Sequence, residues 1–579
     1  MKKRHLAVTI AAVLATGSIT AQEAIDLDQI SSVDGFVIYG HIEDERVGRS
    51  VSGAGDINGD GIDDVIVGAP AASPGNPERN FAGKSYVVFG NESGYPAGLN
   101  LSDLNDSNGF EIDGVDPSDY SGVSVSGAGD VNGDGIDDVI IGAPNLSGTV
   151  PGESYVVFGN GDGFPTRLDL ASLIGISNEG FVINGIDSGD DSGQSVSKAG
   201  DVNGDGIDDV IIGADKADPG IPARDLAGEA YVVFGTNNGS TTDFDLSSIN
   251  GSNGFFLIGD RSGDFSGRAV SGAGDVNGDG IDDVIVGAIG ADPGDPVRNG
   301  AGKTYVIFGF DNSAVSTIFL GGLNGANGFV LNGINAGDYS GRSVSGAGDV
   351  NGDGFDDVIV GASTADNRRG QSYVVFGSGG GFPPSLDLTQ LNGSNGFVLS
   401  GFDPNDYSGS SVSNVGDVNG DGIDDVIIGA RGANQPSTGA SYVVFGRTSG
   451  FPATLNVSDV NGTNGFALNG VDIGDRSGAA VSGAGDVNGD GISDLIIGAF
   501  RADLEAVYEG ESYVLFGNAV PRALGSQSLL FEELEDDSDP LGSRLDFSVA
   551  AQYLDNDAFG GMAVVADAST SAPGAVGIL

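Results

Sequence analysis

The chain has 579 residues, of which 102 are glycine, and it contains neither cysteine nor tryptophan. Its 82 acidic and 24 basic residues give a formal net charge of −58, which disfavours binding to nucleic acid and to anionic membranes, because a basic surface is needed to displace their counterions. The lack of cysteine excludes disulfides and thiolate metal sites. If the chain is exported, its fold needs a means of stabilisation other than disulfides.

Residues 1–21 have the three parts of a secretory signal peptide. Three basic residues within the first four positions precede an apolar stretch from Leu6 to Ala15, and small residues follow. We expect cleavage near Ala21, and the apolar stretch is too short for a stable membrane anchor. The sequence therefore predicts a secreted or cell-surface protein without membrane insertion, with an N-terminal lead over residues 22–34.

The pattern Asp-x-Asn-Gly-Asp-Gly-x-x-Asp occurs seven times along the chain, at separations of 74, 71, 74, 74, 68 and 69 residues. The copies begin at Asp56, Asp130, Asp201, Asp275, Asp349, Asp417 and Asp486. A period near 70 residues is too long for most solenoids but suits the blades of a β-propeller with generous loops.

Four short strand-like segments recur in a fixed order within each unit. In the fifth unit they are the small, glycine-rich 343–348, the apolar 357–362, then 372–377 and 396–401. A propeller blade is narrowest at the central axis, so its innermost strand must carry small residues. The order of sizes predicts an all-β fold, a closed seven-bladed β-propeller of four-stranded blades.

The phase of the repeat predicts how the ring closes. No Gly-Phe strand follows the end of the seventh unit at Gly517, yet an unmatched copy of that strand stands at 35–40. If each outer strand comes from the start of the next unit, this copy completes blade seven and leaves no raw edge there. We therefore expect a propeller domain over 35–517, with 35–40 closing blade seven.

The repeated acidic loops have the spacing of a hard-cation site. In the first copy, oxygen ligands fall at Asp56, Asn58, Asp60 and Asp64, with the carbonyl of Ile62 between the last two. An EF-hand would need a bidentate Glu at position 12 and flanking helices, but that position is apolar in these loops. We expect about seven Ca²⁺ ions, structural rather than catalytic, in place of disulfides.

The predicted calcium ligands are Asp56, Asn58, Asp60, Ile62 and Asp64; Asp130, Asn132, Asp134, Ile136 and Asp138; Asp201, Asn203, Asp205, Ile207 and Asp209; Asp275, Asn277, Asp279, Ile281 and Asp283; Asp349, Asn351, Asp353, Phe355 and Asp357; Asp417, Asn419, Asp421, Ile423 and Asp425; and Asp486, Asn488, Asp490, Ile492 and Asp494. Position 8 of the last copy is Ser493, where the other six copies have Asp.

Residues 35–517 resemble the FG-GAP repeats of integrin α-subunit propellers and their bacterial relatives. The resemblance rests on Gly-x-Ser-Val near residue 341, on the acidic loops, and on Gly-Ala-Pro at 68–70 and 142–144. Most copies have Ser-Gly where the family has Phe-Gly, and five lack the Pro. The resemblance implies calcium in the loop between strands one and two, on a lower face. Ligands would then meet an upper face made by the 2–3 and 4–1 loops.

We interpret the chain as an adhesion or ligand-binding module, not an enzyme, with no catalytic residues. Nucleophilic hydrolases usually need a histidine base, and His41 is the one histidine left after signal removal. The repeated Asp residues are assigned to calcium, and few non-repeated polar residues are left for catalysis at the axis. A carbohydrate-active enzyme on a propeller scaffold and a purely structural surface protein stay open as alternatives.

Basic residues are concentrated in the predicted 2–3 loops of this acidic chain. We hypothesise that Arg79, Arg224, Arg298, Arg431 and Arg501 bind an anionic ligand there, an extracellular protein or an anionic polysaccharide. The first three belong to Pro-x-Arg elements in long loops. The competing hypothesis is that each Arg merely pairs with a neighbouring Asp.

Residues 518–579 carry no copy of the repeat and are acidic. Strand-like pieces at 545–549 and 562–565 weakly resemble the opening of an adhesin β-sandwich module. A loosely ordered tail is the alternative.

Overall fold

The structure is a computed structural model. It describes residues 24–518, except 76, 176–177, 221–223, 238–242, 295, 312–314, 435–436 and 504–507, and the backbone of two strands at 547–551 and 564–568. The predicted signal peptide therefore lies outside the described residues. The chain divides into two compact units, residues 1–524 and 525–579.

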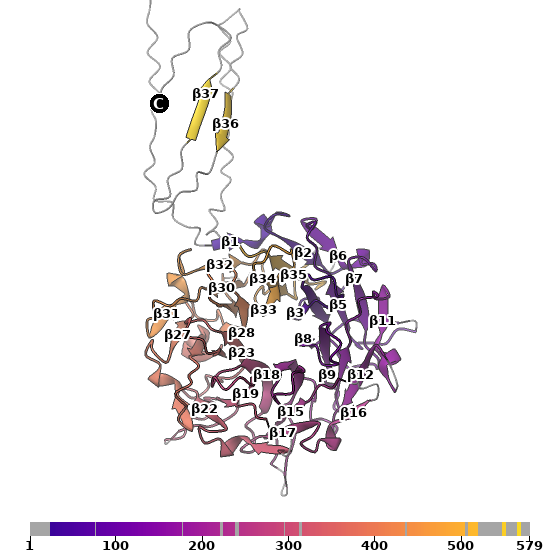
Figure 1. Cartoon of the computed structure of the whole chain (residues 1–579), viewed down its shortest axis with the longest axis vertical. Helices are drawn as coiled ribbons and strands as arrows, with labels where there is room; N and C mark the ends of the chain where they lie inside the picture. Colours follow the sequence, from indigo (N-terminus) through magenta and orange to yellow (C-terminus); the bar gives the residue numbers. More distant parts are fainter. Residues whose placement is uncertain are drawn as a thin grey trace, which may run out of the picture. The chain divides into compact units, whose positions relative to one another are not determined.

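The first unit is a ring of seven sheets, and the chain passes once around it from indigo to orange in Figure 1. This confirms the predicted closed seven-bladed β-propeller. The innermost strands are β3 (Ser50–Gly55), β8 (Ser124–Gly129), β13 (Ser195–Gly200), β18 (Ser266–Gly274), β23 (Ser343–Gly348), β28 (Ser408–Gly416) and β33 (Ala480–Gly485). We number the blades one to seven in this order.

The next three strands of each blade pair antiparallel, in sequence order except in blade seven, where the fourth strand comes from the start of the chain. The second strands are β4 (Asp64–Ala69), β9 (Asp138–Ala143), β14 (Asp209–Ala214), β19 (Asp283–Ala288), β24 (Asp357–Ala362), β29 (Asp425–Ala430) and β34 (Asp494–Ala499). The third are β5 (Lys84–Val88), β10 (Glu153–Val157), β15 (Glu229–Val233), β20 (Lys303–Ile307), β25 (Gln371–Val375), β30 (Ala440–Val444) and β35 (Glu511–Leu515). The fourth are β7 (Gly109–Asp113), β12 (Gly180–Asn184), β17 (Gly254–Ile258), β22 (Gly328–Asn332), β27 (Gly396–Ser400), β32 (Gly465–Asn469) and β2 (Gly35–Tyr39).

Each blade also has a fifth, shorter strand, which the four-stranded prediction lacks. These strands pair parallel to the fourth strand and come from later in the chain, except in blades six and seven. In blade order they are β11 (Arg167–Asp169), β16 (Phe244–Asp245), β21 (Thr317–Phe319), β26 (Ser385–Asp387), β31 (Thr454–Asn456), β1 (Ala24–Asp26) and β6 (Gly98–Asn100).

Short 3₁₀ turns follow the fifth strands. They are η1 (Leu27–Gln29), η2 (Leu101–Asp103), η3 (Leu170–Leu173), η4 (Leu246–Ser248), η5 (Leu320–Gly322), η6 (Leu388–Gln390) and η7 (Val457–Asp459). The one α-helical segment of the described residues, α1 (Ala365–Arg368), is a single irregular turn in a loop of blade five, since Asp366 and Asn367 have φ of 45° and 57°.

Two sheets join strands from both ends of the propeller. β2 pairs antiparallel with β35, with Gly35 opposite Leu515 and Tyr39 opposite Glu511. This is the strand that the repeat phase predicts at 35–40. β1 adds a second closing contact, because it pairs parallel with β32 in blade six. The lead at residues 22–34 thus supplies a strand of the ring, which its sequence does not indicate.

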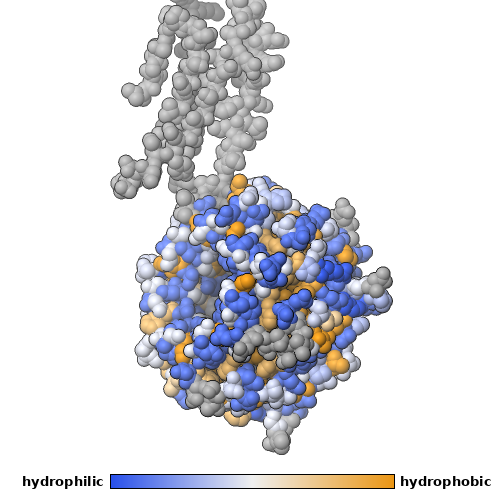
Figure 2. Space-filling model, turned by 45° about the vertical axis from the view of Figure 1, so that its right-hand side comes forward, coloured by the Kyte–Doolittle hydropathy of each residue, from blue (hydrophilic) through white to orange (hydrophobic). Residues whose placement is uncertain are grey.

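Packing between adjacent sheets forms the core. Each second strand is buried at all six of its residues, as expected for a strand with a neighbouring blade on each face. The approach is close enough to require glycine: a Cβ on Gly68 would lie 2.1 Å from the carbonyl oxygen of Gly122 in the next blade. Figure 2 shows hydrophilic residues over most of the visible propeller surface, with hydrophobic residues scattered among them.

The second unit contains one described pair of strands. β36 (Phe547–Ala551) and β37 (Val564–Ala568) are antiparallel, with Val549 opposite Ala566. They overlap the strand-like pieces expected at 545–549 and 562–565. The other residues of this unit lie outside the described part of the chain.

Candidate functional site

The seven acidic loops connect the first and second strands of the blades, and their carboxylates fold them. In blade one the Asp56 carboxylate accepts hydrogen bonds from the N–H groups of Asp60 at 2.9 Å and Gly61 at 2.8 Å. Asp60 in turn accepts from the N–H of Ile62 at 3.0 Å. The two bonds to the first Asp recur in all seven loops. One sequence pattern therefore gives one loop conformation seven times.

The last acidic residue of each loop is buried at the start of the second strand. Asp64 has no exposed surface, and its carboxylate accepts from the N–H groups of Gly90 at 2.7 Å and Ile57 at 3.1 Å. Burial raises the pKa of Asp64 to about 8, since a desolvated carboxylate favours its neutral form. A cation near Asp64 would oppose that shift.

The donor set of each loop fits a calcium ion in its chemistry. Asp56, Asn58, Asp60, Asp64 and the Ile62 carbonyl supply only oxygen, which hard cations prefer. Within the described residues, however, no three His, Cys, Asp or Glu side chains converge as a ready metal cluster. Two of the carboxylates point instead at N–H groups of their own loop.

The Asp at position 8 of the loops has a role that the sequence analysis did not assign. The N–H of Asp56 donates to Oδ2 of Asp137, the position-8 residue of the next loop, at 3.0 Å. Five further contacts of this kind join Asp130 to Asp208, Asp201 to Asp282, Asp275 to Asp356, Asp349 to Asp424, and Asp486 to Asp63. Blade six faces Ser493 instead, and there Gly416 donates to Asn414 of its own strand. The sequence carried a signal for this role, because six copies share an Asp at position 8 that the predicted ligand set leaves without a role.

A recess at the axis is lined by small residues of the innermost strands, among them Ser52, Gly53 and Gly127. Lys198 and Asn414 replace the glycine at this position in blades three and six. The Lys198 ammonium forms an ion pair with Asp208 at 3.0 Å. In the described part of the chain, the Lys198 ammonium is thus a basic group that lies beside the position-8 carboxylates bordering the recess.

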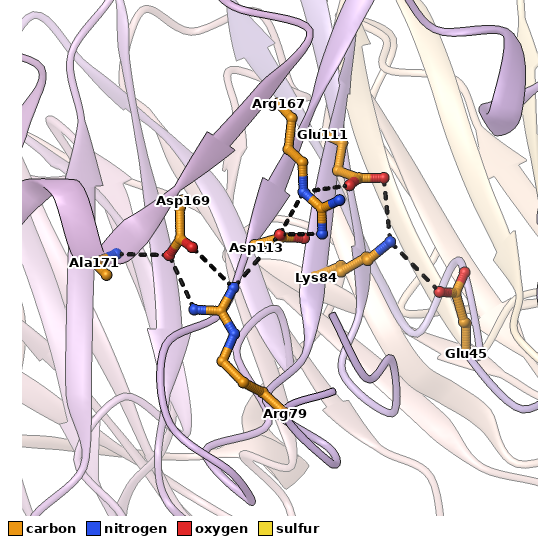
Figure 3. A network of polar contacts seen from close by, with 8 residues as sticks. All are labelled: Glu45, Arg79, Lys84, Glu111, Asp113, Arg167, Asp169 and Ala171. Atoms are coloured by element: carbon orange, nitrogen blue, oxygen red, sulfur yellow. Dashed lines mark hydrogen bonds and ion pairs between the residues drawn. The ribbon is translucent and has the colours of Figure 1, made fainter. Parts of the chain in front are cut away.

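The upper face, made by the 2–3 and 4–1 loops, holds the arginines predicted to bind ligand. Arg79 makes a two-bond contact with Asp169 of β11, at 3.0 Å for each nitrogen–oxygen pair, and also approaches Asp113 of β7 (Figure 3). Arg167 donates to the same Asp113 at 2.6 Å. Lys84 continues the network to Glu45 of the 4–1 loop. Arg79 thus ties its loop to the outer strands of its own blade.

The other two Pro-x-Arg elements are also held by contacts within their own blades. Arg298 forms an ion pair with Asp387, in the fifth strand of blade four, at 2.7 Å. Arg224 donates to the carbonyl oxygens of Pro219 and Asp260 and lies 5.9 Å from the ring of Phe319, in the fifth strand of blade three. For these three arginines the structure gives partners within the blade.

Arg431 and Arg501 lie in a different environment, against aromatic rings. Arg431 is 5.2 Å from the Tyr407 ring, and Arg501 is 5.6 Å from each of the rings of Phe500 and Tyr508. Neither forms an ion pair with any residue that the structure describes. His41 lies half-buried, and burial is the main cause of its lowered pKa.

Comparison with protein families finds the FG-GAP repeat seven times. The matches cover residues 47–88, 121–157, 192–233, 266–307, 340–375, 408–444 and 477–515. Each match runs from the start of the innermost strand of a blade, or just before it, to the third strand. The family repeat therefore covers the three inner strands of each blade.

Several relatives are similar over part of their length. Integrin alpha-4 of Xenopus laevis is 29% identical over 212 residues, which are 36% of this chain and 18% of the relative. A phosphatidylinositol-glycan-specific phospholipase D of Bos taurus is 32% identical over 194 residues, 32% of this chain and 21% of the relative. Integrin alpha pat-2 of Caenorhabditis elegans is 30% identical over 246 residues, 40% of this chain and 17% of the relative. The chain thus matches about a fifth of the length of these relatives.

Proposed function

The chain belongs to the integrin-α-like FG-GAP repeat propellers, and on this premise we propose that it is an exported, calcium-stabilised module for adhesion or ligand binding. The observation that carries the proposal is the match of seven repeats to seven closed blades. Such a ring gives a rigid scaffold whose loops are free to vary, which is where recognition usually lies.

Calcium has a structural role in this proposal. The seven loops share one fold, an all-oxygen donor set and a buried carboxylate. Sites filled at ten times their dissociation constant would each add about 1.4 kcal/mol to the free energy of unfolding, and seven about 10 kcal/mol. Gains of that size equal the net stability of a typical domain.

The ligand would bind the upper face, since the loops on the lower face are engaged in the calcium turns. The proposed residues there are Arg431 and Arg501, which have no ion pair among the described residues. Arg79, Arg224 and Arg298 would contribute by holding the outer loops in place.

Secretion or surface location is part of the same proposal and rests on the leader-like residues 1–21. None of the helical segments in the described part of the chain is long and apolar enough to cross a membrane. The phospholipase D relatives carry an enzyme's name, so catalysis has to be tested alongside binding.

An array of matrix proteins and glycans tests the function, with the purified protein in calcium and in chelator. We expect a specific ligand in calcium, no product from any glycan, and a large fall in melting temperature with chelator. Calorimetric titration should give about seven calcium ions per chain. Two or fewer sites, or a melting temperature unchanged by chelator, would contradict the calcium role. Cleavage of an arrayed polysaccharide would favour the enzyme alternative, and an array without any bound ligand would leave a structural surface protein as the better explanation.

A further inference from the structure

Seven arginines of this acidic protein form no ion pair with any described residue and lie in one arc of the upper face, over blades five, six, seven and one. We call them the axial arginine cluster. They are Arg46, Arg49, Arg342, Arg368, Arg431, Arg476 and Arg501. Because the chain has 82 acidic residues, such a group of unpaired cations is unexpected.

Aromatic rings join arginines of the cluster in two groups, and the first lies between blades one and seven. Arg49 and Arg501 both approach the ring of Phe500, at 5.3 Å and 5.6 Å. Arg501 also contacts the ring of Tyr508, whose carbonyl oxygen accepts the N–H of Arg46 at 3.2 Å. These contacts join the 4–1 loop that enters blade one to the 2–3 loop of blade seven.

A second ring extends the cluster to blades five and six. Arg368 and Arg431 both approach Tyr407, at 5.9 Å and 5.2 Å. Burial, followed by the charges of Arg342 and Arg476, lowers the pKa of Arg431. The guanidinium groups are therefore near enough to repel one another.

At the equivalent position of another blade, an ion pair relieves repulsion of this kind. Arg49, Arg268 and Arg342 occupy one position, two residues before the first buried valine of the innermost strand. Arg268 forms an ion pair with Asp215 at 3.2 Å, whereas Arg49 and Arg342 have no such partner in the described residues. Both arginines immediately precede innermost strands, which surround the axis, so they belong to the inner part of the upper face.

The loops that present the cluster have a backbone held in an uncommon conformation. Arg46, Arg368, Tyr407, Arg476 and Tyr508 have φ between 56° and 65°, a left-handed region that non-glycine residues seldom adopt. The equivalent residues Tyr120, Asp191, Phe265 and Tyr339 of other blades have φ between 50° and 56°, so the repeat fold itself enforces this conformation. Rigid loop tips reduce the entropy lost when a ligand binds.

We propose that the axial arginine cluster binds a linear acidic polysaccharide through its carboxylate or sulfate groups, which refines the ligand-binding function proposed above and rests on it. Guanidinium groups bind such oxyanions through two parallel hydrogen bonds. A polymer with many anionic groups can neutralise several arginines at once and release its own counterions.

The cluster is better suited to a hydrated polymer than to a protein partner, which would bury it in the core of an interface. Burying several guanidinium groups under a protein would remove the hydration of each ion at a large cost in free energy. A polysaccharide chain leaves them partly hydrated. The Tyr407 and Tyr508 rings beneath them offer flat, amphipathic surfaces beside the charges.

The test uses the full-length protein in calcium, with polygalacturonate and dextran sulfate as probes and neutral dextran as the uncharged control. We expect binding to at least one charged probe and none to dextran. The double variant Arg49→Ala/Arg431→Ala should weaken binding at least tenfold with an unchanged calcium content. Binding by the natural chain should also weaken steeply as salt rises.

Arg447→Ala is the matched control. Arg447 also lacks an ion pair among the described residues and stacks on a ring, Phe451 at 4.4 Å, but its N–H bonds to Val350 in a calcium loop on the lower face. This variant removes the same charge and should bind as the natural chain does. If the double variant loses its cooperative melt, Arg342→Ala alone should still weaken binding several-fold.

Two results would overturn the proposal in distinguishable ways. If the natural chain binds a matrix protein, an acidic peptide, DNA or a neutral glycan but neither charged polysaccharide, the cluster has another role and the adhesion function stands. If the natural chain and the variants of the cluster bind the charged probes equally, the cluster likewise has another role and the adhesion function stands. If no ligand binds on the whole array, the proposal and the adhesion function fail together.

Discussion

The N–H of Asp56 in blade one donates to Oδ2 of Asp137 in blade two at 3.0 Å. Six of the seven acidic loops are capped in this way by a carboxylate from a neighbour, and the series passes through the closure point, because Asp486 donates to Asp63 at 2.8 Å. The acidic loops are therefore coupled around the ring, except where Ser493 replaces the aspartate of blade seven.

The coupling predicts opposite effects at two copies of one position. Asp137→Ala should lower the free energy of unfolding by about 1–3 kcal/mol, because it leaves the N–H of Asp56 without its charged acceptor. Ser493→Asp should raise it by less than about 1 kcal/mol, since Asn414 already serves the neighbouring N–H of Gly416. Chemical denaturation at fixed calcium measures both. An aspartate at position 493 that destabilises the chain would refute the capping role.

Ring closure predicts which terminal deletions are harmful. Removing residues 35–40 takes away β2 and leaves the edges of β35 and β6 unpaired, so the melting temperature should fall far more than after deletion of 518–579. Deleting β1 should give an intermediate loss, because it uncovers β32 alone. Thermal unfolding of the three variants is the measurement, and equal losses would argue against closure by the N-terminal strands.

The Pro-x-Arg elements should prove to be stabilising clamps. Alanine at Arg79, Arg224 and Arg298 together should lower the free energy of unfolding by about 1–3 kcal/mol. Arg79 and Arg298 would lose partly exposed ion pairs that contribute up to about 1 kcal/mol each, and Arg224 would lose its hydrogen bonds to backbone carbonyls. Binding of a charged polysaccharide should change less than twofold. Loss of binding at an unchanged melting temperature would instead support a direct ligand role for these three arginines.

A buried carboxylate predicts a pH effect of definite sign. Burial raises the pKa of Glu45 from its ordinary value near 4.5 to about 7, against the opposing effect of Lys84. A raised pKa in the folded state means that the stability due to the neutral acid is complete below about pH 4.5. It is lost as pH rises through about 7, and amounts to at most about 3 kcal/mol.

Glu45→Gln should remove this share of the pH dependence while its side-chain oxygen keeps the hydrogen bond from Tyr86. The experiment compares free energies of unfolding for both chains between pH 5 and pH 8. The variant should gain on the natural chain as pH rises. A constant difference across the range would show that Glu45 does not titrate there.

Much of the propeller could be predicted because its determinants are local and repeated. The strand at 343–348 has small residues because it faces the axis, and the strand at 357–362 is apolar on both faces because a blade lies on either side. Spacing alone placed the acidic loops between these strands. The phase of the repeat located β2 in blade seven.

Other features depend on residues that the fold brings together from distant units. The fifth strands span only two or three residues, too few to show a periodicity. Nothing in the sequence near Arg79 indicates that Asp169 is its partner, and Arg49 and Arg501 meet over Phe500 only when the ring closes. The count of arginines in 2–3 loops therefore could not separate the clamps from the axial arginine cluster.

The joined sheets of blades six and seven also constrain how the protein can be made. Strands β1 and β2 are synthesised first, yet their partners β32 and β35 are among the last parts of the propeller to be synthesised. During synthesis the early strands must stay without these partners, and such contacts between distant parts of a chain form slowly. A product truncated before residue 511 would retain open sheet edges, which invite aggregation. Completion of the ring is thus a built-in check that the whole propeller has been translated.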